Sequence, residues 1–87
     1  MKVLIKNDAV KEIQVTLSYG ENAPMHTGTK RLIDSINVYM IRFNTPNTPG
    51  EELNYTEGDV HWHEGGRHSV NNIGDNPAEF LVVEFKK

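Results

Sequence analysis

The chain has 87 residues, which leaves room for one domain with a thin hydrophobic core. Its formal net charge is −3 and it has no basic stripe, so it lacks the electrostatic signature of a nucleic-acid-binding protein. It contains no cysteine, which excludes disulfides, thiolate catalysis and cysteine-ligated metal centres. Any metal ion would therefore be held by histidine, aspartate or glutamate.

No segment has the length and apolar character of a signal peptide or a membrane span. We therefore expect a cytoplasmic protein that contacts neither a membrane nor nucleic acid. A chain this short buries only about 60–65% of its unfolded surface. Because a second copy would add buried area, we expect a homodimer.

The first half of the chain is expected to form β-strands, since helix signals are weak and turn residues recur, first at Gly20–Pro24. Residues 3 and 5 are apolar, and lysines flank this short run at positions 2 and 6. The β-branched residues of Val10 to Leu17 favour a strand over the helix that Ala9–Ser18 would also allow. Ser35–Phe43 predicts one continuous strand, with apolar residues on both faces.

Further strands are predicted in the second half, at Glu51–Tyr55, Asp59–His63, His68–Asn72 and Glu79–Phe85. The last of them is apolar on both faces, which predicts a strand buried between two layers. Many short strands separated by turns predict an all-β sandwich or barrel. The chain shows no linker or internal repeat, so we treat residues 1–87 as a single domain.

The four histidines are the main candidates for chemistry, because His61, His63 and His68 fall within eight residues and His26 lies upstream. In an extended strand, His61 and His63 point to the same side. A turn at the following glycine pair would place His68 opposite His63. Neutral imidazoles bind zinc, iron, copper, nickel and, less often, manganese. The alternative, which we favour for His61 and His63, is an ordinary position on a solvent-facing strand edge.

Residues Gly58 to Asn72 resemble the second sequence motif of the cupin superfamily. The matching positions are Gly58, Asp59, Gly66, His68 and Asn72. Upstream, Gly20 and His26 have the spacing that opens the first cupin motif. The resemblance extends from Gly20 to Lys87. It implies an all-β fold, a small cupin-type jelly-roll barrel (double-stranded β-helix) with a pocket inside.

The first motif departs from the family pattern at two of its ligand positions. The family places a second histidine where this chain has Gly28, and a glutamate where it has Leu32 and Ile33. Asp34 is the nearest acid. By position, the resemblance therefore keeps only His26 and His68 as metal ligands. His61 or His63 would have to complete a divalent metal site, because stable sites need three or four ligands.

The resemblance leaves three functions open. The first is a metal-assisted oxygenase, isomerase or lyase acting on a small polar molecule, with Trp62, Tyr39 and Arg67 contacting the substrate. Each of these three also has a plainer role, in packing or at the surface. The second is a non-catalytic barrel that binds a small carboxylate, sugar or metal. The third is an interaction protein with Tyr39, Ile41 and Phe43 as its contact face. The sequence does not decide whether the chain is an enzyme.

Overall fold

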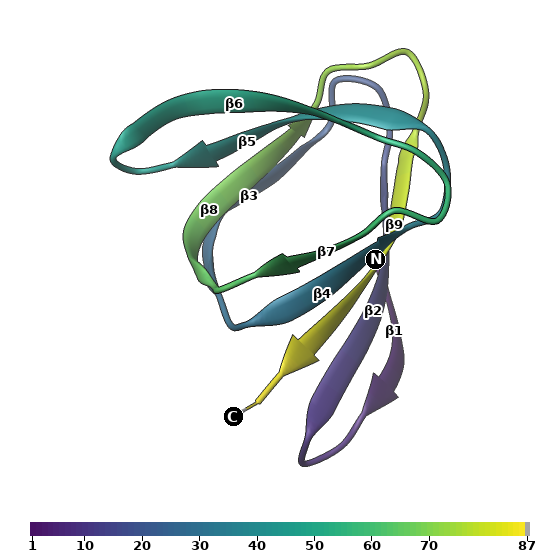
Figure 1. Ribbon diagram of the computed structural model, residues 1–87, viewed down its shortest axis with the longest axis vertical. Helices are drawn as coiled ribbons and strands as arrows, with labels where there is room; N and C mark the ends of the chain where they lie inside the picture. Colours follow the sequence, from purple (N-terminus) through teal and green to yellow (C-terminus); the bar gives the residue numbers. More distant parts are fainter. Residues whose placement is uncertain (87) are drawn as a thin grey trace.

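The computed structural model describes residues 1–86, which form nine β-strands and no helix. The strands are β1 (Lys2–Lys6), β2 (Val10–Leu17), β3 (Asn22–Gly28), β4 (Arg31–Ser35), β5 (Tyr39–Thr45), β6 (Thr48–Tyr55), β7 (Val60–His63), β8 (Gly66–Asn72) and β9 (Ala78–Phe85) (Figure 1). The all-β prediction is confirmed. Within residues 1–86, no helix long and apolar enough to cross a membrane is present.

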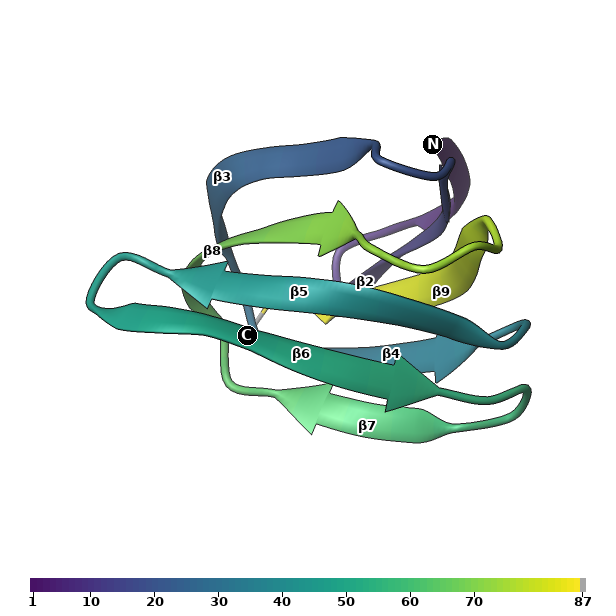
Figure 2. The same cartoon turned by 90° about the horizontal axis from the view of Figure 1, so that it is seen from above.

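The strands form two antiparallel sheets. One sheet has five strands in the order β1-β2-β9-β4-β7, and the other has four in the order β3-β8-β5-β6. Figure 2 shows the strands of the four-stranded sheet lying side by side. Except at the β1–β2 and β5–β6 hairpins, each connection carries the chain from one sheet to the other. This alternation builds the jelly-roll barrel predicted from the sequence.

The strand predicted at Ser35–Phe43 is interrupted, and this part of the sequence prediction is wrong. Ser35 ends β4 in the five-stranded sheet, and Tyr39 begins β5 in the other. Asn37 fixes the crossing, since its side chain donates to the Pro77 carbonyl oxygen at 2.8 Å and accepts from the Glu79 amide at 3.1 Å. Alternation of apolar residues continues through such a crossing, so the pattern could not reveal it.

Two smaller expectations also change. The turn residues at Gly20–Pro24 overlap the start of β3, which begins at Asn22. No second layer covers the outer face of β9 within residues 1–86. Leu81, Val83 and Phe85 lie there half-buried, while Phe80 and Val82 face the core. The outward-facing apolar residues of β9 are half-buried because β9 is the central strand of the five-stranded sheet, where side chains of β2 and β4 flank it on both sides.

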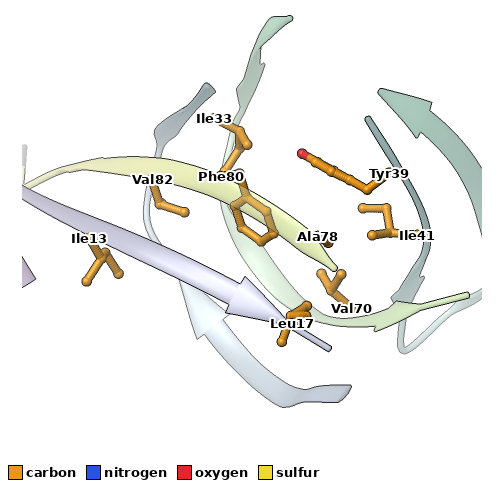
Figure 3. Packing of buried hydrophobic residues seen from close by; sticks show 9 residues of the cluster. All are labelled: Ile13, Leu17, Ile33, Tyr39, Ile41, Val70, Ala78, Phe80 and Val82. Atoms are coloured by element: carbon orange, nitrogen blue, oxygen red, sulfur yellow. The ribbon is translucent and has the colours of Figure 1, made fainter. Parts of the chain in front are cut away.

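The hydrophobic core lies between the two sheets (Figure 3). Every strand that contributes does so through alternate residues, as the two-residue period of a strand requires. The buried set is Ile13, Leu17, Ile33, Tyr39, Ile41, Val70, Ala78, Phe80 and Val82. Tyr39 and Ile41 thus lie inside the barrel with Phe43 packed against the same cluster, and the contact face predicted from these three residues is not on the surface.

Asn72, one of the residues that matched the second motif, is almost fully buried. Its side-chain amide donates to the backbone oxygens of Leu17 and Asn76, each at 2.8 Å, and its side-chain oxygen accepts from the amide of Gly74 at 3.0 Å. Asn72 therefore satisfies backbone groups at the end of β2 and in the turn before β9. Its role at this position is structural.

Candidate functional site

A cavity of about 410 Å³ lies between the two sheets, next to the core. Most of its wall is apolar, formed by inward-facing residues of β2, β5, β8 and β9. Its charged and imidazole side chains are those of four histidines, one arginine, one lysine and one glutamate: His26, His61, His63, His68, Arg31, Lys11 and Glu84. His26 is exposed as well as lining the cavity, so the cavity reaches the surface beside β3.

The histidines enter the cavity from three strands. His26 on β3 and His68 on β8 are direct cross-strand partners, with ring centroids 4.4 Å apart. His61 and His63 share the inner face of β7, with ring centroids 4.8 Å apart. The solvent-facing position favoured for His61 and His63 is therefore wrong. The sheet turns that face of β7 inward, which the composition of one strand cannot show.

The glycine turn after β7 does not make a hairpin. Gly65 and Gly66 have positive φ angles of 98° and 108°, as a sharp turn requires. However, β7 belongs to the five-stranded sheet and β8 to the four-stranded one, so His68 lies opposite His26 and not opposite His63. His63 and His68 still approach the same aromatic ring, since each stacks on Phe43 with centroids 5.3 Å apart.

Burial keeps the inner imidazoles neutral near pH 7. Loss of hydration lowers the pKa of His63 to about 4, and the neighbouring His61, Arg31 and His68 act in the same direction. Loss of hydration, followed by the charge of Arg31, lowers the pKa of His68 to about 4. Burial also lowers the pKa of His61, although Asp59 opposes this. Arg31 and Lys11 are the positively charged side chains in the cavity wall.

Arg31 is the residue that sequence reasoning missed. It is the first residue of β4, is only 6% exposed, and directs its guanidinium into the cavity. Nη1 donates to the Thr29 carbonyl oxygen at 3.2 Å, while Nη2 lies 2.7 Å from Nε2 and 3.1 Å from Nδ1 of His68. The Gly66 carbonyl oxygen lies 3.3 Å from Nδ1. These partners assign the ring proton to Nδ1, so that Nε2 accepts from Arg31.

Gly28 makes room for this arginine. A Cβ atom at position 28 would overlap Nη1 of Arg31 and would lie 3.0 Å from Cε1 of His68. In the resemblance described above, position 28 is where a second histidine would stand. Arg31 therefore fills space that a side chain at position 28 would need, and Gly28 was the one sequence signal that could have pointed to it.

The residues present do not fit a resident divalent metal ion. The Nε2 lone pair of His68 already accepts from Arg31, whose positive charge would repel a cation at the same point. Asp34, the nearest acid to the missing glutamate, is exposed and does not line the cavity. In the described part of the chain, no group of three or more histidine, aspartate or glutamate side chains is placed to share one ion.

Of the three residues predicted to contact a substrate, one lines the cavity and two lie outside it. Tyr39 lines the cavity, with its hydroxyl 2.7 Å from Oγ of Ser35. Trp62 is 48% exposed and lies outside the cavity lining, where it packs against Phe85 and its indole nitrogen donates to Glu64. Arg67 is exposed and also lies outside the lining. The arginine that reaches the cavity is Arg31.

Comparison with solved structures identifies the fold. A cupin domain from Bordetella pertussis superposes with a TM-score of 0.90 over 99% of this chain and 91% of its own, at 23% sequence identity. An RmlC-like cupin family protein from Methanocaldococcus jannaschii, with a double-stranded β-helix fold, superposes with a TM-score of 0.78 over 97% of this chain and 76% of its own, at 22% sequence identity. A cupin superfamily protein from Desulfitobacterium hafniense superposes with a TM-score of 0.74 over 98% of this chain and 74% of its own, at 13% identity.

No protein-family model matches the sequence, and neither does any curated protein. The likeness is therefore one of fold. This chain has the cupin fold, the double-stranded β-helix, as its second motif predicted.

Proposed function

We propose that this chain uses its cupin fold to bind a small organic molecule in the cavity between the sheets, without a resident metal ion. The cavity carries the proposal. Its volume of about 410 Å³ lies within the range of small-molecule sites, and its wall is mainly apolar with a few polar groups at one end. Apolar walls supply binding energy, while convergent polar groups orient the ligand.

One observation favours the metal-assisted oxygenase or isomerase that the sequence resemblance implied. Nδ1 of His61 is buried and lacks a hydrogen-bond partner within residues 1–86, and a buried nitrogen of this kind is a potential ligand. A metal site built with His68 would, however, require Arg31 to leave its Nε2 atom. Binding of an organic molecule without a metal ion does not require Arg31 to move away from His68.

Saturation-transfer NMR with benzamide, a neutral aromatic probe, tests this proposal on metal-stripped protein. Val15→Trp would extend a large side chain into the cavity, and Thr16→Trp makes the same kind of change on the opposite face of β2. We expect wild type and Thr16→Trp to bind benzamide at millimolar concentration, and Val15→Trp to lose this binding. Equal signals from both variants, or no binding by wild type, would contradict the proposal.

A second experiment measures the metal content of the protein. Wild type and His68→Ala are both purified without a histidine tag, and the metal bound to each is measured by elemental mass spectrometry. We expect substoichiometric metal in both proteins. One ion per chain in wild type that disappears in His68→Ala would replace this proposal with the metalloenzyme.

A further inference from the structure

The buried guanidinium of Arg31 has no carboxylate partner in the described part of the chain. The ion pair found within 4.0 Å there joins Arg42 and Glu52, on the surface. Taking an arginine out of water is unfavourable unless its charge is compensated. Arg31 is nevertheless 94% buried against an apolar cavity, since only 6% of it is exposed. A charge kept in such a place is an indication of function.

The guanidinium retains donors for a ligand. Arginine carries five N–H groups in a planar fork that matches a carboxylate. In this structure Nη1 donates to Thr29 and Nη2 to His68, and the other N–H groups have no protein acceptor within residues 1–86. His68 holds the guanidinium in place from β8 of the four-stranded sheet, and the Thr29 carbonyl oxygen holds it from the connection between β3 and β4.

The charged and titratable groups around Arg31 leave a net positive charge. Glu84 is its cross-strand neighbour on β9, and Lys11 on β2 is in turn the neighbour of Glu84. On the other side, His63 on β7 is in register with Arg31. Lys11 and Arg31 outnumber Glu84 among the charged side chains of the cavity wall, and this excess of positive charge favours an anionic ligand.

We infer that the ligand is a monocarboxylate with a compact apolar body, and that Arg31 is the receptor for its carboxylate. This inference rests on the proposed function, since it assigns the chemistry of the same cavity. The carboxylate accepts from the guanidinium of Arg31, while His68 positions that guanidinium. The apolar body lies against Phe43, Val70 and the neighbouring wall of the barrel.

Isothermal titration of metal-stripped protein with benzoate, in a low-chloride buffer, tests the inference against benzamide, which has the same shape and no charge. We expect benzoate to bind at least about tenfold more tightly than benzamide, as a charge-assisted bidentate contact implies. Arg31→Gln should remove this preference, because it removes the charge that distinguishes benzoate from benzamide. Arg67→Gln, at an exposed arginine outside the cavity, should keep the wild-type preference.

Glu84→Gln provides a gain-of-affinity test that does not depend on the folding of the Arg31 variant. The carboxylate of Glu84 repels an anionic ligand and attracts the guanidinium of Arg31. Its removal should therefore tighten benzoate binding several-fold and leave the affinity for benzamide unchanged. Equal binding of benzoate and benzamide by wild type would overturn the carboxylate inference and leave the binding barrel standing. Failure of both probes to bind would overturn the binding barrel as well.

Discussion

Nη2 of Arg31 lies 2.7 Å from Nε2 of His68, although 37 positions separate the two residues in the sequence. β4 carries the arginine in one sheet and β8 carries the histidine in the other, so their contact joins the two layers across the cavity. The contact places a positive charge where the resemblance to metal-binding cupins implied a ligand set.

A buried charge kept for ligand binding should weaken the folded state. We expect Arg31→Met, which retains much of the volume, to raise the free energy of unfolding by about 1 kcal/mol, because the guanidinium is no longer transferred out of water. Urea denaturation measures this change. Arg42→Met removes an exposed arginine paired with Glu52 at 2.8 Å and should change stability by less than about 0.5 kcal/mol. A loss above about 1 kcal/mol in Arg31→Met would assign Arg31 a structural role.

The hydroxyl of Tyr39 should make the fold sensitive to alkali. Burial raises the pKa of Tyr39 to about 12, with Tyr55, Asp59 and Asp34 acting in the same direction and the hydrogen bond to Ser35 opposing. Because the folded pKa lies above the unfolded one, the contribution is complete below about pH 10 and is lost as pH rises towards 12. We expect a loss of about 2–3 kcal/mol over that window.

Urea denaturation across this pH range measures the loss. Tyr39→Phe, which cannot ionise, should show a shallower alkaline decline than wild type. Tyr19→Phe changes a tyrosine that is 71% exposed and should follow the wild-type curve. Identical declines in wild type and Tyr39→Phe would show that Tyr39 does not ionise against the fold.

Gly65 and Gly66, where the chain passes from β7 into β8, should respond unequally to substitution by alanine. Both residues have positive φ, which costs an alanine about 1–2 kcal/mol. At Gly65 a Cβ atom would also lie 2.8 Å from the Gly28 carbonyl oxygen, whereas at Gly66 it would meet nothing within 4 Å. We expect Gly65→Ala to lower stability by about 1–3 kcal/mol more than Gly66→Ala in thermal or urea unfolding. Equal losses would indicate that the loop relaxes freely.

The predicted homodimer would use the outer face of the five-stranded sheet. Trp62, Leu32 and Val83 are in register there across β7, β4 and β9 and form an apolar row. We expect sedimentation to give a dimer for wild type and a monomer for Trp62→Glu, since a buried charge opposes association. Val38→Glu, at a residue 55% exposed between β4 and β5, is the matched control and should remain dimeric. A monomeric wild type would contradict the prediction.

Several features could be predicted from the sequence because they depend on local pattern. The strand at Val10–Leu17 follows from its β-branched residues, and the positive φ of Gly65 and Gly66 follows from the turn they must make. The spacing of Gly58 to Asn72 indicated the cupin fold, which the solved structures confirm. Each of these signals lies within one strand or one turn.

Which residues form the candidate site could be seen only in the tertiary structure. Whether His61 and His63 face solvent or the cavity is decided by which face of β7 packs inward, and the break between β4 and β5 is decided by the crossing between sheets. Apart from Gly28, the sequence around Arg31 did not indicate its burial, because that burial arises only when β8 brings His68 against the guanidinium in the space beside Gly28. Strand patterns and one motif were therefore enough to predict the barrel, whereas the guanidinium inside it became visible only once the two sheets were packed together.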